Sequence, residues 1–329
     1  MSQIKLGVSL YCFTKEYVEG SYTLEDCIEK AREMDVDGYE IVATQMVDSY
    51  PAISDEFLGR ITRANRMYGM NTISYGANMD RGMRCDRDLT EDEMVQMTIQ
   101  DIKNASKLGC KVMRAQFLLS PNALVRVTPI AEEYNVKVGI EIHNPETPST
   151  PIMQAYYEAI VASKSNYIGF VVDFGSFANK PNKPNYDEAL ANGAPKELLD
   201  FVAECRLQNI ERHDVLKQLA ERNAPAAVYG AFEAMYGFLA FSSTPDYEGL
   251  KRIMPYVFHF HGKFHYMNED GSEASIPYED ILKVIYESDY EGYIVSEFED
   301  HVAGTALEMT QKHIAMEKRI LNALAKGGK

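Results

Sequence analysis

Positive charge is scarce in this sequence. Its 329 residues include 33 lysines and arginines against 49 aspartates and glutamates, which gives a formal net charge of −16. A protein that follows a phosphate backbone presents an extended basic surface, and this composition disfavours such a surface. We therefore expect no nucleic acid among its partners.

Paired cysteines and long apolar runs are missing as well. The five cysteines are scattered and odd in number, so neither a disulfide framework nor a zinc-finger spacing is indicated. No uncharged run approaches the roughly 20 residues that cross a bilayer, and no basic stretch precedes a long apolar one at the N-terminus. We expect a soluble, cytoplasmic protein without a membrane partner.

What the sequence does contain is a regular alternation of short β-like runs and longer amphipathic runs. Eight strands are predicted, at 4–13, 38–43, 71–78, 111–118, 136–143, 167–175, 257–264 and 292–299. Eight helices are predicted, at 23–34, 56–69, 91–109, 123–134, 151–164, 246–254, 278–288 and 306–326. The stretch 176–243 interrupts this rhythm and is predicted to be mostly helical.

This alternation predicts a parallel sheet with helical crossovers, and eight units have the size of a (β/α)₈ barrel. A doubly wound open sheet is the competing architecture. The first strand lacks the G-x-G-x-x-G turn of a dinucleotide-binding sheet, and an open sheet gives no reason for polar residues at the ends of the last four strands. We predict one α/β domain over 1–329, a TIM barrel with the helical insertion 176–243 after strand six.

Ionisable residues lie near the C-terminal ends of those last four strands, where barrel active sites are built. They are Glu141 in "GIEIH", Asp173 in "FVVDFG", the histidines of "VFHFHGKFH" and Glu297 in "VSEFE". Converging carboxylates would repel one another unless a divalent cation lay between them. Oxygen and nitrogen ligands without thiolate suit Mn²⁺ best, with Zn²⁺, Co²⁺, Fe²⁺ and Mg²⁺ as options. The sequence leaves open whether His259 or His261 is the histidine ligand of the metal. His259 lies deeper along the strand and could instead be a hydrogen-bonded core histidine.

These motifs resemble those of the sugar phosphate isomerase/epimerase superfamily, whose xylose-isomerase-like barrels hold a divalent metal with a Glu-Asp-His-Glu set from strands five to eight. The resemblance spans essentially the whole chain, and "HFHGK" is similar to the family's H-x-K-D motif. It implies that Glu141, Asp173, His261 and Glu297 hold the metal. Phe264 stands where the motif usually has Asp, so any role of that Asp is absent or supplied elsewhere.

Within the superfamily the chain looks most like the catalytic α subunits of bacterial C-glycoside deglycosidases. The likeness rests on "LGVSLYCF" at the start, "EIHNPETPSTP" after strand five, and the insertion after strand six. It implies cleavage of the carbon-carbon bond between a sugar and a flavonoid or related phenolic, in a sugar already oxidised to its 3-keto form. It also implies a small β subunit as partner in a hetero-oligomer.

The chemistry of such a substrate needs an electrophile and a base, because a ketone at sugar carbon 3 acidifies the hydrogen on carbon 2. Strand alternation places His143 on the same inner side as Glu141 and nearer the opening, which makes it the candidate base or, alternatively, a hydrogen-bonded orienting residue. Lys263, His265 or a metal-bound water is the candidate proton donor. Arg114 binds a substrate oxygen or, equally, serves as an ion-pair partner of the acids.

Each acid also has a purely structural interpretation. Glu141 or Glu297 alone is compatible with a salt bridge at the barrel mouth, and Asp173 with a turn or helix cap. Two other functions remain open beside the deglycosidase. A ketose epimerase or keto-sugar isomerase would use the same metal site, and a non-catalytic partner protein would use the barrel and the insertion 176–243 to stabilise a complex.

Overall fold

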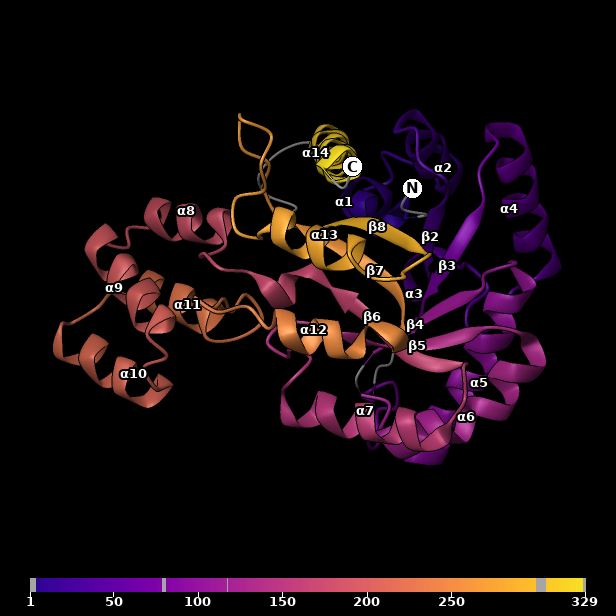
Figure 1. The fold of residues 1–329 in the computed structure, drawn as a ribbon, viewed down its shortest axis with the longest axis horizontal. Helices are drawn as coiled ribbons and strands as arrows, with labels where there is room; N and C mark the ends of the chain where they lie inside the picture. The colour runs from indigo at the N-terminus through magenta and orange to yellow at the C-terminus, as the bar shows by residue number, and fades with distance from the viewer. Residues whose placement is uncertain (1–3, 79–80, 117, 300–305, 328–329) are drawn as a thin grey trace.

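The centre of the molecule is a closed barrel of eight parallel strands (Figure 1). The computed structural model describes residues 4–78, 81–116, 118–299 and 306–327. The strands are β1 (Lys5–Ser9), β2 (Tyr39–Val42), β3 (Thr72–Gly76), β4 (Val112–Ala115), β5 (Lys137–Ile142), β6 (Ile168–Asp173), β7 (Val257–Phe264) and β8 (Tyr293–Phe298). Each pairs with the next, and β8 closes on β1. The predicted TIM barrel is confirmed, and the open sheet was the wrong alternative.

Helices surround this barrel. The helices that follow the strands are α2 (Leu24–Glu33), α4 (Asp55–Tyr68), α5 (Glu91–Lys107), α6 (Pro121–Tyr134), α7 (Pro151–Ser163), α12 (Tyr247–Ile253), α13 (Tyr278–Tyr286) and α14 (Ala306–Gly327). Shorter turns are η1 (Leu10–Phe13), α1 (Thr14–Val18), α3 (Ala43–Met46), η2 (Phe174–Phe177) and η3 (Met254–Tyr256). Of the helices that the structure describes, none is both long and apolar enough to pass through a membrane.

Local signals in the sequence set the helix boundaries. Thr23 and Thr90 each form a capping box, with Asp26 and Glu93 respectively, so that side chains satisfy backbone groups at the starts of α2 and α5. Helix α4 ends at Gly69, whose φ of 66° suits glycine. These caps explain why the helical stretches were readable from sequence.

The first strand was predicted to run through residue 13, and this was wrong. Strand β1 ends at Ser9, where the side-chain oxygen accepts a hydrogen bond from the backbone N–H of Tyr11 at 3.3 Å. That cap turns the chain into the 3₁₀ helix η1, which buries Leu10, Cys12 and Phe13. A run of apolar residues cannot by itself distinguish a buried turn from a continued strand.

The strand register brings polar side chains together at one end of the barrel. Asp173 of β6 pairs with His261 of β7, and Lys263 of β7 pairs with Glu297 of β8. Paired residues of neighbouring strands point to the same face of a sheet, and residues two apart on one strand do so as well. All four side chains therefore share the inner face of the barrel near its C-terminal end.

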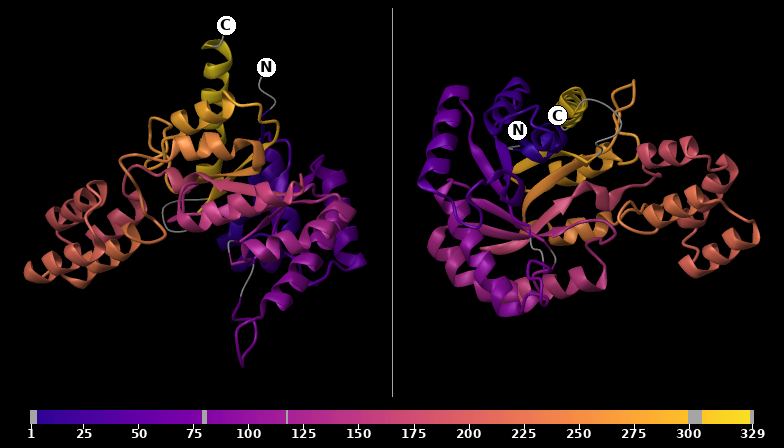
Figure 2. Two further views of the ribbon diagram at one scale, coloured as in Figure 1. Left: turned by 60° about the horizontal axis from the view of Figure 1, so that its bottom comes forward. Right: turned by 180° about the vertical axis from the view of Figure 1, so that it is seen from behind.

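Four further helices stand beside the barrel between β6 and α12 (Figures 1 and 2). They are α8 (Lys183–Ala191), α9 (Lys196–Leu207), α10 (Arg212–Glu221) and α11 (Ala226–Met235). Their buried apolar side chains form a cluster of their own that includes Leu199, Val215, Leu219 and Phe232, and among the described residues no barrel strand contributes to it. The Asn144 side chain donates to the Ala240 carbonyl at 2.6 Å and ties the insertion to the loop after β5.

Candidate metal centre

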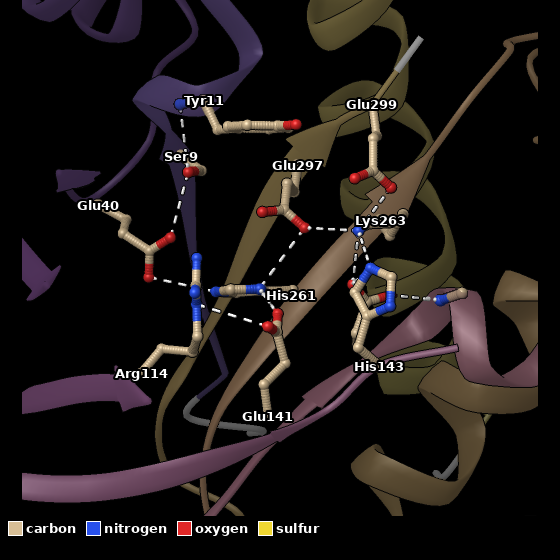
Figure 3. A network of polar contacts seen from close by, with 12 residues as sticks. Ser9, Tyr11, Glu40, Arg114, Glu141, His143, His261, Lys263, Glu297 and Glu299 are labelled. Carbon is tan, nitrogen blue, oxygen red and sulfur yellow. Dashed lines mark hydrogen bonds and ion pairs between the residues drawn. The ribbon is translucent and has the colours of Figure 1, made fainter. Parts of the chain in front are cut away.

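Four buried side chains meet inside the C-terminal end of the barrel, one from each of β5 to β8. They are Glu141, Asp173, His261 and Glu297, and one potential ligand atom of each lies within 4.8 Å of those of the others. Figure 3 shows Glu141 and Glu297 on either side of the His261 ring. The structure thus brings together the four residues that the sequence indicated as ligands.

Asp173 illustrates how a structural role and a ligand role coexist. Its Oδ1 accepts a hydrogen bond from the backbone N–H of Gly175 at 2.6 Å, which is the predicted turn and cap interaction. Its Oδ2 is buried without a hydrogen bond of good geometry, and so is Oε2 of Glu297. Both oxygens instead face the ammonium of Lys263, at 2.9 Å and 3.2 Å. Two such oxygens beside an imidazole suit a divalent cation.

His261 contacts acids through both ring nitrogens. Its Nδ1 lies 2.7 Å from Oε1 of Glu141 and 3.5 Å from Oε2 of Glu297, and its Nε2 lies 3.2 Å from Oε2 of Glu40. Burial by itself would lower the pKa of His261, but the negative charges of Glu40 and Glu297 and the bond to Glu141 raise it well above its ordinary value. Without a metal ion, the imidazole is therefore held as a cation.

His259, the other candidate ligand, lies deeper in the barrel. Its Nε2 contacts Ser74 Oγ at 3.2 Å and Oε2 of Glu40 at 3.6 Å. Burial lowers the pKa of His259 despite the nearby Glu40, so it is neutral at pH 7. Together with Glu40 and His261 it forms a second group that could hold a metal ion. The four-residue group at β5 to β8 offers more oxygen ligands, which favours His261 as the ligand.

The ammonium of Lys263 lies among several carboxylates (Figure 3). Besides Asp173 and Glu297, its Nζ contacts Oε2 of Glu299 at 2.7 Å and donates to Nε2 of His143 at 3.0 Å. Burial would lower the pKa of Lys263, but the charges of Asp173, Glu297 and Glu299 raise it well above its ordinary value. Lys263 therefore holds its proton tightly and acts here as a fixed positive charge.

The contacts of His143 define its tautomer. Its Nδ1 lies 2.8 Å from the backbone carbonyl of Asn144, and its Nε2 lies 3.0 Å from Lys263 Nζ. A carbonyl can only accept and an ammonium can only donate, so Nδ1 carries the proton and Nε2 presents a lone pair. The side chain is 24% exposed, and Nε2 lies 4.0 Å from Oδ2 of Asp173. His143 is thus a neutral imidazole whose basic nitrogen faces the ligand cluster, which is our name for Glu141, Asp173, His261 and Glu297.

His265 lies beyond this cluster. Its side chain is buried, which lowers its pKa to about 4, so the imidazole is neutral at pH 7. It lines a cavity of about 170 Å³ together with Glu299 and with Phe238 and Leu239 from the segment after α11. A larger cavity, of about 730 Å³, lies between α13 and α14 and shares no residue with the ligand cluster.

Arg114 on β4 is buried next to Glu141. Its Nε lies 3.6 Å from Oε2 of Glu141, and its Nη1 donates to the Ala77 carbonyl at 2.9 Å and to Oδ1 of Asn78 at 3.0 Å. The sequence left open whether Arg114 pairs with an acid or binds substrate, and these contacts match the ion-pair role. A contact between Arg114 and substrate stays a prediction.

Comparison with known proteins places this geometry in a family. The xylose isomerase-like TIM barrel family matches residues 28–319. The chain belongs to this family. It is 32% identical over 310 residues to the 3'-dehydrocarminate deglycosidase alpha subunit of a Microbacterium species, covering 90% of this chain and 88% of that protein. It is 31% identical over 307 residues to a C-glycoside deglycosidase alpha subunit of Arthrobacter globiformis, covering 91% and 86%.

Solved structures agree with the family at the level of the fold. An L-ribulose 3-epimerase has a TM-score of 0.60 to this chain at 12% sequence identity, and the match covers 99% of this chain and 97% of the epimerase. The resemblance inferred from the sequence motifs is therefore confirmed, both for the xylose isomerase-like barrel and for the deglycosidase α subunits.

Two acids of this xylose isomerase-like barrel were missed by sequence reasoning. Glu40 sits inside "YEIV" on β2, fully buried, and burial would raise its pKa, but His261 and His259 hold it well below its ordinary value. Glu299 is the second acid of "SEFE", and the charge of Lys263 offsets burial and lowers its pKa to about 2. The only sequence signal for Glu40 was an acid in the middle of a buried-looking strand.

Proposed function

We propose that the protein is the catalytic α subunit of a metal-dependent C-glycoside deglycosidase. The observation that carries this proposal is the neutral His143, whose basic Nε2 lies beside four converging metal-ligand side chains. Relatives named as deglycosidase α subunits, similar over about nine tenths of the chain, support the reaction and imply a partner subunit.

In this proposal Glu141, Asp173, His261 and Glu297 hold a divalent ion, for which Mn²⁺ fits the oxygen-rich donor set. When bound, the ion supplies a Lewis acid that polarises the 3-oxo group of the sugar and stabilises the enediolate. The chain itself supplies the fixed geometry, since each of the four side chains projects from a different strand of one closed barrel.

His143 removes the proton. Its Nε2 takes the hydrogen from sugar carbon 2, and the electron pair of that C–H bond becomes part of the enediolate. When the 3-oxo group re-forms, a double bond develops between carbons 1 and 2, and the bond from carbon 1 to the aromatic ring breaks with its electron pair on the ring. Lys263 donates to the same Nε2 in the free protein, so substrate binding must shift this ammonium towards its carboxylate partners.

The departing aromatic carbon then needs one proton, which balances the proton lost from carbon 2. His143, which received that proton on Nε2, returns it to the carbon, and the Lys263 ammonium 3.0 Å away favours its release because two neighbouring positive charges repel. His265 is neutral at pH 7 and lies against Glu299 at the edge of the insertion, where it suits contact with the aglycone better than proton donation.

Release of a free flavonoid from a 3-oxo-C-glucoside tests this function directly. We expect release when the chain is co-expressed with the small β subunit of a related deglycosidase and supplied with Mn²⁺. Chromatography measures the released flavonoid. His143→Gln should lower the rate by about 10²–10⁴-fold, the usual contribution of a general base. His213→Gln, at an exposed position on α10, is the matched control and should leave the rate unchanged.

A ketose epimerase or keto-sugar isomerase is the second candidate, because it needs the same base and ion and because an epimerase shares the fold. Both reactions begin with proton abstraction next to a carbonyl, but only the deglycosidase requires an aromatic leaving group. Conversion of a ketohexose with Mn²⁺, without any release of flavonoid, would favour the epimerase. If no divalent ion binds and the double variant Glu141→Gln, Asp173→Asn behaves like the wild type, the non-catalytic interpretation holds.

A further inference from the structure

We propose that Glu40 is a positioning residue, which orients His261 so that Nδ1 points at the metal-binding carboxylates. This inference rests on the proposed metal centre and adds a residue to it from β2, on a strand that supplies none of the four ligands. Glu40 contacts His261 through the nitrogen that faces away from Glu141 and Glu297 (Figure 3).

The two ring nitrogens of His261 are engaged on opposite sides. Nδ1 lies 2.7 Å from Glu141 and Nε2 lies 3.2 Å from Glu40. An imidazole that ligates a metal through Nδ1 must give up the proton there and keep the one on Nε2. The Glu40 carboxylate is the acceptor for that remaining proton, and the contact fixes both the tautomer and the rotation of the ring.

Glu40 is itself held rigidly, as an orienting group must be. Ser9 on β1 donates to its Oε1 at 3.1 Å, and Ser74 on β3 donates to its Oε2 at 2.8 Å. The three residues come from neighbouring strands, and all are fully buried. A carboxylate held by two hydroxyls has little freedom to turn away from His261.

An alternative is that Glu40, His259 and His261 ligate a second ion, since these three also converge. That arrangement would use the lone pair of Nε2 on His261, which leaves the proton on Nδ1 facing Glu141 and Glu297. One imidazole tautomer cannot serve both arrangements. With a neutral His261, the proposed centre with three carboxylates therefore competes with a second ion that would use Nε2 of the same ring.

Metal affinity and the ring proton of His261 test this inference. Calorimetric titration of metal-free protein with Mn²⁺ should show about 10-fold weaker binding in Glu40→Gln and about 100-fold in Glu40→Leu, the range found when such an orienting partner is removed. The amide oxygen of Gln still accepts the Nε2–H bond, which explains the partial rescue. Glu317→Gln is the matched control, because Glu317 is equally buried but contacts Ser296 on the other side of β8.

A spectroscopic readout separates orientation from mere stability. In the Co²⁺-loaded protein, the Nε2–H proton of a bound His261 should give one exchangeable, paramagnetically shifted resonance, which Glu40→Leu makes exchange faster with solvent. If the wild type binds no ion, the proposed metal centre fails. If the wild type binds but Glu40→Leu matches it in affinity and in that resonance, the positioning role alone is overturned. Two ions per chain would overturn it in favour of Glu40 as a ligand.

Discussion

Lys263 shows how a single side chain can balance a crowded group of acids. Its ammonium lies within 3.2 Å of Asp173, Glu297 and Glu299, and it is buried. An unpaired buried carboxylate is costly, so in the metal-free protein these three depend on Lys263. The same two oxygens of Asp173 and Glu297 are proposed to bind the ion, which would relieve that dependence.

We expect Lys263→Met to destabilise the metal-free protein by about 3–5 kcal/mol, because it leaves buried acids without their cation. Urea unfolding in the presence of a chelator measures the loss, and excess Mn²⁺ should recover part of it. Lys183→Met, which removes an exposed ion pair with Asp187, should cost less than about 1 kcal/mol. Equal losses in the two variants would contradict the counter-ion role of Lys263.

Asp101, a buried acid on α5, predicts a pH effect away from the site. Burial raises its pKa to about 7 from an ordinary value of 3.8. As the pH rises from 4 to 7 the unfolded chain loses this proton and the native state keeps it, so the native state loses stability and the loss levels off above pH 7. The stability of Asp101→Asn relative to the wild type should therefore increase from pH 4 to pH 8, by up to about 4 kcal/mol.

Urea unfolding of Asp101→Asn and the wild type at both pH values measures this gain. Asp92→Asn, an exposed acid of the same helix, should change stability by less than about 0.5 kcal/mol at either pH. A difference between Asp101→Asn and the wild type that does not vary with pH would show that Asp101 is ionised in the native state.

At the scale of elements, the insertion is a separate packing unit. Leu219 on α10 is fully buried in the insertion cluster, and Leu124 on α6 is fully buried in the barrel cluster. Leu219→Ala should cost about 2–5 kcal/mol of local stability, because it leaves a cavity in a small core. Hydrogen exchange should then accelerate in 183–235 and stay unchanged in the barrel strands. Leu124→Ala should show the reverse pattern, and acceleration throughout both variants would contradict two cores.

Most of the elements and the candidate ligand residues were accessible from sequence. Strand and helix periods alternate, and barrel chemistry lies at the C-terminal strand ends, so Glu141 and Asp173 could be found without coordinates. Glu40 could not, because the contact between β2 and His261 exists only once the barrel has closed. The end of β1 at Ser9 was also out of reach, since a local side-chain cap overrides an apolar run.

For the whole molecule, a bound ion should add to the free energy of unfolding. At a free Mn²⁺ concentration 100 times the dissociation constant, the gain is about 2.7 kcal/mol, provided that the unfolded chain does not bind. We expect a rise in melting temperature of roughly 5 °C, reversed by a chelator and measured by calorimetry. Glu141→Gln combined with Asp173→Asn should abolish the rise. The same rise in that double variant would place the ion elsewhere.

The apolar core of α8 to α11 is separate from the barrel core that carries the candidate ligand residues. Helix α8 begins ten residues after Asp173, and the apolar cluster of α8 to α11 draws on no barrel strand among the described residues. Phe238 and Leu239 of the insertion line the cavity that His265 and Glu299 also line. Substitutions within the insertion can reshape what covers the barrel mouth and leave the ligand side chains in place. Under the proposed function, aglycone preference and proton-transfer chemistry would therefore reside in separate packing units.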